Sequence, residues 1–177
     1  MQESVLIVGA GDAGERILRE IIKILEPKGI VVLNSERELP EDLQKYVFDF
    51  HKNDVAHYIA NSKLFISDST TMCAEAAVLG IPAIEIDDWF ADFKQYEELK
   101  ERYSLLFGFG VEDIEKIKEK IEELTTNVNI KAEYKKRQEY MLTEKIDASA
   151  YLIWMIENYP ESSEEFFKDK TMQLKFR

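Results

Sequence analysis

Hydroxyl and carboxylate side chains gather in one short stretch of this chain, between two apolar segments. An apolar run at Leu64–Ile66 is followed by Ser67–Thr71, a block of hydroxyl side chains with one carboxylate. Met72–Leu79 favours a helix, which Gly80 and Pro82 end because glycine accepts a positive φ and proline cannot continue the helix. A helix that begins at the carboxyl end of a strand directs unpaired N–H groups and a partial positive charge into the crevice there. This stretch therefore predicts a phosphate-binding site.

A second loop of the same kind lies near the N-terminus. The apolar run Ser4–Val8 predicts a buried strand and leads into residues 9–14, which match G-x-G-x-x-G. Apolar residues at helical spacing predict a helix over Glu15–Leu25, and Ile30–Leu33 is apolar enough for a second buried strand. The glycines permit a tight turn and close approach of a diphosphate to the backbone. The alternative is a turn that only packs the helix against the sheet.

The same loop leaves a dinucleotide-binding function open. Such sites usually carry an acidic residue at the end of the second strand, where it holds a ribose. Asn34 stands at the predicted strand end and Glu36 lies two residues further on. An NAD(P)-binding module is therefore one alternative to a site for another nucleotide.

Strands and helices alternate over the first two thirds of the chain. Further strands are predicted at Tyr46–Phe50, Ala83–Ile86 and Tyr103–Phe109, with helices at His51–Ser62 and Val111–Leu124. This order predicts an α/β fold, a Rossmann-like open parallel sheet with helices on both faces. Because the carboxyl ends of parallel strands meet at one edge, both loop–helix units should open there.

Composition narrows the classes of function. The chain has 177 residues and a formal net charge of −12, which disfavours a nucleic-acid surface. The single Cys73 cannot form an internal disulfide and is expected to be a small buried residue rather than a nucleophile. There is no basic segment typical of a secretory signal at the start and no apolar run of membrane length. We expect a cytoplasmic protein without a transmembrane segment.

The C-terminal third is predicted to be helical. Charged residues over Ile130–Met141 predict one helix, and Asp147 is placed to cap an apolar helix over Ala148–Asn158. We expect one domain over residues 1–160 and a polar C-terminal tail over residues 161–177.

The central stretch resembles a known family of sugar-transferring enzymes. Asp54–Ile86, with its Ser-Asp-Ser-Thr-Thr block, Ala-Glu-Ala-Ala helix and Leu-Gly-Ile-Pro-Ala stop, resembles the donor-binding C-terminal domain of GT-B glycosyltransferases. It is also similar to the related UDP-N-acetylglucosamine 2-epimerases. Val5–Leu18 is similar to the first strand and glycine loop of that domain, and Met141–Ser162 resembles an uncharacterised GT-B-like family. The resemblance extends to about Glu161 and implies one half of a GT-B fold.

The resemblance implies roles for individual residues. It places Ser69, Thr70 and Thr71 on the donor diphosphate and Glu75 on the ribose hydroxyls. The candidate nucleotide-binding residues are Gly9, Gly11, Asp12, Gly14, Phe50, His51, Asp68, Ser69, Thr70, Thr71 and Glu75. Of these, Phe50 and His51 match the loop that meets the uracil in the family. Looser candidates for the donor sugar are Asp92, Gln95 and Tyr96.

Two departures from the family bear on function. The loop carries Ser69-Thr70-Thr71 where the family often has Ser-Gly or Gly-Gly, so hydroxyl contacts would replace close backbone approach. A complete GT-B enzyme has two such domains, and the acceptor and usually the catalytic base belong to the other one. The sequence therefore predicts a UDP-sugar-binding half that needs no metal or further cofactor and works with an acceptor-binding partner domain or chain. The alternatives are the NAD(P)-binding module and a non-catalytic interaction domain.

Overall fold

The structure is a computed structural model, and it consists of two compact units. It describes residues 4–8, 14–35, 37–88 and 96–177. The units are Met1–Gln138 and Glu139–Arg177. The domain boundary predicted after residue 160 falls inside the second unit.

The first unit is built on a parallel sheet with the strand order β2-β1-β3-β4-β5. Its strands are β1 (Ser4–Val8), β2 (Ile30–Asn34), β3 (Ser62–Ser67), β4 (Ala83–Ile86) and β5 (Leu106–Phe109). Every pair of neighbours is parallel, which confirms the predicted open parallel sheet. All four residues of β4 are buried, as expected for a strand covered on both faces.

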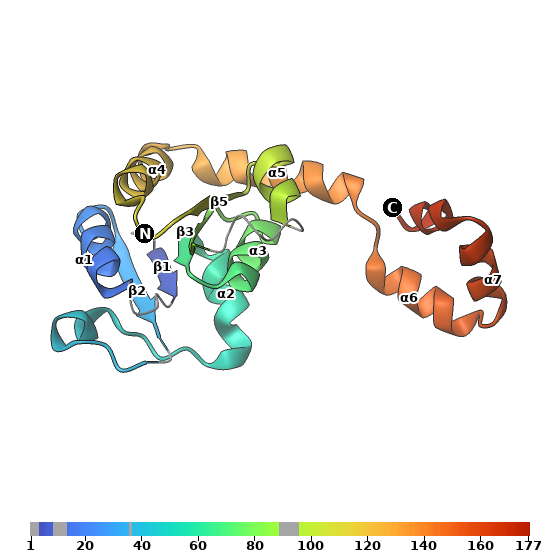
Figure 1. Ribbon diagram of the computed structural model, residues 1–177, viewed down its shortest axis with the longest axis horizontal. Coiled ribbons are helices and arrows are strands. Elements are labelled where there is room, and N and C mark those ends of the chain that lie inside the picture. Colours follow the sequence, from blue (N-terminus) through green and yellow to red (C-terminus); the bar gives the residue numbers. More distant parts are fainter. Residues whose placement is uncertain (1–3, 9–13, 36, 89–95) are drawn as a thin grey trace. The chain divides into compact units, whose positions relative to one another are not determined.

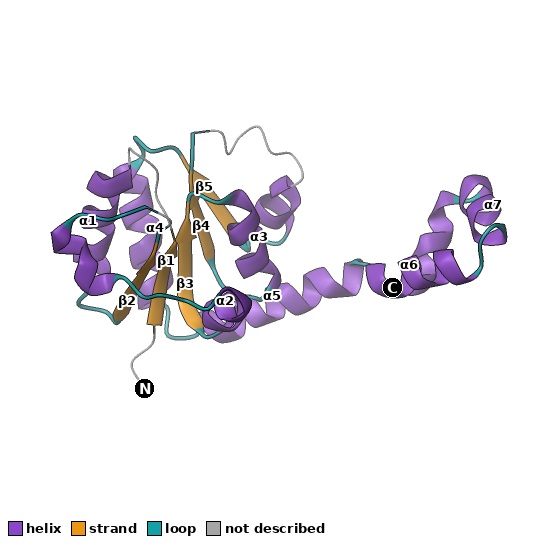
Figure 2. Ribbon diagram, turned by 90° about the horizontal axis from the view of Figure 1, so that it is seen from below, coloured by secondary structure: helices purple, strands orange, loops and turns teal. Residues whose placement is uncertain are grey.

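Helices cover both faces of this sheet (Figures 1 and 2). The helices of the first unit include α1 (Gly14–Leu25), α2 (Val55–Ala60), α3 (Thr70–Val78), η5 (Glu98–Arg102), α4 (Ile114–Thr126) and the start of α5 (Ile130–Glu144). The pair α1 and α4 packs together on one face, and α2 and α3 pack together on the other. The helices that follow β1 and β3 thus leave on opposite faces, and the crevice between such strand ends is where ligands bind in open α/β sheets.

The predicted strand at Tyr46–Phe50 is wrong. After the short 3-10 helix η1 (Glu41–Tyr46), the chain makes one parallel bridge between Val47 and Leu33, where Phe48 N donates to Leu33 O at 2.9 Å. Phe48 and Phe50 then pack edge-on against Tyr58 of α2, with ring centroids 5.5 and 4.6 Å away. This aromatic cluster draws both side chains to one place, so the segment does not alternate along the sheet edge.

The helix predicted over His51–Ser62 is shorter than expected. It is divided into the 3-10 turn η2 (Lys52–Asp54) and α2, which ends at Ala60. Ser62 belongs to β3, and its hydroxyl donates to the carbonyl of Ile59 at 2.8 Å. This hydrogen bond satisfies a carbonyl group in the last turn of the helix, and the strand begins two residues after the helix ends.

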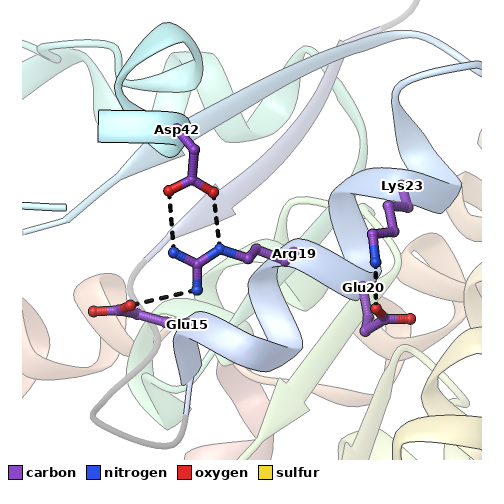
Figure 3. A network of polar contacts seen from close by, with 5 residues as sticks. All are labelled: Glu15, Arg19, Glu20, Lys23 and Asp42. Carbon is purple, nitrogen blue, oxygen red and sulfur yellow. Dashed lines mark hydrogen bonds and ion pairs between the residues drawn. The ribbon is translucent and has the colours of Figure 1, made fainter. Parts of the chain in front are cut away.

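An ion pair fixes the chain that follows β2 against α1 (Figure 3). Arg19 of α1 donates to both carboxylate oxygens of Asp42 in η1, at 2.8 and 3.1 Å, and also contacts Glu15 at 3.5 Å. The hydrogen bond from Arg19 holds the pKa of Asp42 below its usual value. The pair is exposed and adds little stability, but its two-point geometry orients η1 and the loop that continues toward Phe50.

The second unit is helical. It contains the end of α5, then α6 (Ala148–Glu157), α7 (Glu161–Lys168) and the 3-10 helix η6 (Lys170–Phe176). Asp147 caps α6 as predicted, accepting from Ala150 N at 2.9 Å. Tyr151 and Trp154 of α6 pack on Phe176. In the part of the chain that the structure describes, no helix has the length and apolar character to cross a membrane.

Gly80, which ends α3, is the position where the backbone most needs a glycine. Its φ is +78°, and a Cβ there would lie 3.1 to 3.3 Å from side-chain atoms of Gln138. We predict that Gly80→Ala lowers the free energy of unfolding by about 1 to 2 kcal/mol, measured by urea denaturation. At Gly110 the φ is not positive, and a Cβ would meet the ends of two side chains, Asp88 at 3.1 Å and Asp113 at 3.7 Å. Gly110→Ala is the control, and an equal loss in both variants would contradict the argument.

Candidate functional site

The N-terminus of α3 is held at the carboxyl end of β3 by two serines. Ser69 is the N-cap, and its hydroxyl accepts from the amide of Met72 at 3.5 Å. The hydroxyl of Ser67, the last residue of β3, accepts from the amide of Ser69 at 3.0 Å. The amides of Thr70 and Thr71 come first in the helix and have no intrahelical acceptor. This arrangement presents N–H donors and the positive end of the helix at the sheet edge.

A buried carboxyl group lies beneath the first residue of α3. Glu85 of β4 is fully buried, and one of its oxygens is hydrogen-bonded to the hydroxyl of Thr70. Its other oxygen, Oε2, has no hydrogen-bond partner among the residues that the structure describes. Sequence reasoning missed this residue, although a single carboxylate in the otherwise apolar run Ala83–Ile86 was the signal that would have found it.

Burial changes the proton affinity of two groups here. Burial, with a smaller contribution from Asp87, raises the pKa of Glu85 above its usual value against the opposing effect of the Thr70 hydrogen bond. Burial also raises the pKa of the Cys73 thiol, and the charge of Glu85 adds to the effect. Cys73 is fully buried in α3, with Sγ 3.7 Å from Ser67 O and 3.6 Å from Ile84 O. It is a small buried residue, as the sequence predicted.

Two predicted site residues share the exposed face of α3. Thr71 and Glu75 are both exposed and lie four positions apart, which places them one turn from each other. Asp68 is half-buried in the turn before the N-cap. A ligand that touches the start of the helix can therefore reach a hydroxyl and a carboxylate on the same face.

The predicted residues Phe50 and His51 line a separate hollow. It has a volume of about 640 Å³, is open to solvent, and is lined by Asp49, Phe50, His51 and Asn53. Phe50 is buried against Tyr58 and Phe48, while His51 is exposed and accepts from the amide of Asn53 at 3.4 Å. Asn34, at the end of β2, donates to Phe48 O at 3.3 Å and ties this loop to the strand.

The hollow and the start of α3 lie at the same edge of the sheet. Phe48, which leads into the hollow, is hydrogen-bonded to Leu33 and Asn34 at the end of β2, and α3 follows β3, with β1 between the two strands. The ends of β2 and β3 are two strand spacings apart, which corresponds to about 10 Å.

The remaining predicted residues fall into two groups. Gly14 is buried and begins α1, and Tyr96 is half-buried before η5. The others lie outside the described residues, namely Gly9, Gly11, Asp12, Asp92 and Gln95. The contribution of the glycine loop and of the loop after β4 thus stays a prediction.

Solved structures that share the fold include glycosyltransferases and epimerases, whereas no family model and no curated protein matches the sequence. The calicheamicin glycosyltransferase CalG4 has a TM-score of 0.60 at 14% identity, over 90% of this chain and 43% of its own. The spinosyn rhamnosyltransferase SpnG, complexed with thymidine diphosphate, has a TM-score of 0.58 at 16% identity, over 89% and 46%. A UDP-N-acetylglucosamine 2-epimerase from Listeria monocytogenes, described as putative, has a TM-score of 0.56 at 15% identity, over 75% and 39%.

This chain has the fold of one half of a GT-B structure. It spans less than half the length of these solved chains. The likeness extends to the fold, as the sequence predicted.

The buried carboxyl of Glu85 has a consequence for stability. Because its pKa is raised in the folded protein, the unfolded chain releases this proton first, and stability falls as pH rises from the ordinary glutamate pKa to the raised one. We predict that Glu85→Gln removes this fall, so that the variant gains stability relative to the parent across that window and keeps the gain above it. Urea denaturation at several pH values measures the difference.

Glu75→Gln is the control, because it also removes one carboxylate from this acidic chain, but at an exposed position. A stability difference between the Glu85→Gln variant and the parent that stays constant with pH would contradict the assignment of a raised pKa to Glu85.

Proposed function

We propose that the first unit binds a nucleoside diphosphate sugar at the carboxyl edge of its sheet, as the donor-binding half of a glycosyltransferase or epimerase-like protein. The observation that carries the proposal is the pairing of two features at one edge. These are the N-terminus of α3, with its amides and the hydroxyl of Ser69, and the hollow beside Phe50 and His51. SpnG, which shares the fold, is complexed with thymidine diphosphate.

The diphosphate would be bound by the start of α3. The amides of Thr70 and Thr71 donate toward the space in front of the helix. The hydroxyl of Ser69 can also donate its proton to a phosphate, because only its oxygen is used in the hydrogen bond from Met72. Negative charge is favoured at this point by the helix dipole, without a metal ion. The site residues named here include no lysine or arginine, so the helix terminus would supply the stabilisation of the phosphate charge.

The nucleoside would extend from the helix toward the hollow. Glu75 is exposed on the same face of α3 as Thr71, where its two carboxylate oxygens can accept from a pair of ribose hydroxyls. The uracil would lie in the hollow lined by Asp49, Phe50, His51 and Asn53. These contacts make a UDP-sugar the ligand that we propose.

Catalysis would require a second domain or chain. In the proposed reaction the helix terminus stabilises the charge that develops on the leaving UDP. The acceptor and the catalytic base would come from a partner, in accordance with the fact that this chain spans less than half the length of the solved enzymes it matches. We therefore expect the chain alone to bind a UDP-sugar weakly and to show no turnover.

Replacing Glu75 tests the nucleotide site. We predict that Glu75→Ala lowers the affinity for UDP about tenfold or more, because hydrogen bonds to a charged group are lost, while the melting temperature changes little at this exposed position. Isothermal titration calorimetry measures the affinity. Glu119→Ala is the matched control, since Glu119 is an exposed glutamate in α4, on the opposite face of the sheet.

Three outcomes separate the proposal from its alternatives. No binding of UDP at millimolar concentration would contradict the nucleotide-sugar site. Binding of NAD in preference to UDP would indicate the NAD(P)-binding module. Equal affinities in the Glu75→Ala variant and the parent would show that Glu75 does not hold the ribose.

A further inference from the structure

The hydrogen bond between Thr70 and Glu85 joins the buried interior to the start of α3. Thr70 is the first residue of the helix and is half-buried, and Glu85 beneath it is fully buried. A threonine hydroxyl has one proton and two lone pairs, so it can either donate to Glu85 or accept from it. The positions of Thr70 Oγ1 and Glu85 Oε1 are compatible with a hydrogen bond in either direction.

The protonation state of Glu85 decides between these directions. An ionised Glu85 can only accept, and then the single hydroxyl proton of Thr70 is directed inward. A neutral Glu85 can donate its proton to Thr70, and the hydroxyl proton of Thr70 is then free to point outward, in front of the helix. The two states present opposite polarity to a ligand at the same place.

The surroundings of Glu85 favour the neutral form. Its oxygen Oε2 is buried without a hydrogen-bond partner among the described residues, and an ionised carboxylate would leave part of its charge there without a donor. Its register partners on β3 and β5, Ser67 and Gly108, carry no charge. Among the residues that the structure describes, the titratable groups that act on Glu85 or on its neighbour Cys73 are acidic: Asp87 follows β4 and acts on Glu85, Cys73 on α3 is coupled to Glu85, and Asp68 in the turn before α3 acts on Cys73.

We propose that Glu85 is a positioning residue that sets the polarity of the Thr70 hydroxyl, so that the site binds a diphosphate group when Glu85 carries a proton and releases it when Glu85 is ionised. The ligand part of this inference rests on the proposed function. Loss of the proton removes one donor to the phosphate and places a negative charge behind the first turn of α3, so both effects act in the same direction.

The coupling between the two residues is tested first in the protein without ligand. Carbon NMR follows the carboxyl signal of Glu85 and the β-carbon signal of Thr70 from about pH 5 to about pH 8.5. We expect the two signals to titrate with one midpoint, and we expect the Thr70 titration to vanish in Glu85→Gln. A Thr70 signal that is constant with pH, or that titrates unchanged in Glu85→Gln, would overturn the proposal.

The effect on binding is tested with UDP-N-acetylglucosamine as the probe, because its diphosphate is a diester whose charge stays constant over this range. We expect the affinity of the parent to fall about tenfold or more as pH rises through the Glu85 midpoint. Glu85→Gln should bind equally at all these pH values, because its amide N–H₂ can donate to Thr70 without titrating. Thr70→Ser should keep the pH dependence, whereas Thr70→Val should bind more weakly and keep only the part of the pH dependence that the charge of Glu85 causes.

The outcomes of the two measurements are distinct. A pH dependence of affinity in Glu85→Gln equal to that of the parent would overturn the role of Glu85. Failure of every variant to bind the probe at any pH would overturn the proposed function, while the ligand-free titration would still decide the coupling between Glu85 and Thr70.

Discussion

Parallel pairing of the strands is the constraint on which the rest of the first unit depends. Because β1 is hydrogen-bonded to β2 on one side and β3 on the other, the connections after all three strands emerge at one edge. Parallel neighbours also require crossover helices, and these bury the central strands on both faces. The apolar character of the strands and the gathering of polar groups at their carboxyl ends are consequences of the same pairing.

A carboxyl group within such a sheet is unfavourable and needs compensation. Glu85 occupies a strand position where an apolar residue would pack without loss, and Thr70 satisfies one of its oxygens. Stability alone does not account for a glutamate there, since removing the charge is expected to stabilise the fold. A polar role at the adjacent start of α3 does account for it, and the raised proton affinity that follows from burial is then part of that role.

Local patterns predicted most of the first unit because they reflect burial. The apolar runs of β1, β2 and β4 and the helical spacing of Ile17, Leu18 and Ile21 identified their elements nearly to the residue, whereas β3 is three residues longer than its apolar run. The segment at Tyr46–Phe50 failed because its aromatic residues pack on Tyr58, a contact that no local pattern reveals. For the same reason the sequence indicated Thr70 as a ligand contact but did not reveal that Glu85, fifteen positions away, is hydrogen-bonded to its hydroxyl.

The helix at the candidate site is fastened at both ends. Ser69 and Thr70 hold its start, and Gln138 of α5 donates to Val78 O at 2.5 Å at its end, over the space that Gly80 leaves without a side chain. These contacts at both ends oppose sliding and tilting of α3. The donors in front of α3 are thus in position before any ligand arrives, and little ordering entropy is lost on binding. Gln138, which lies on another helix, thereby helps to set the position of the candidate site.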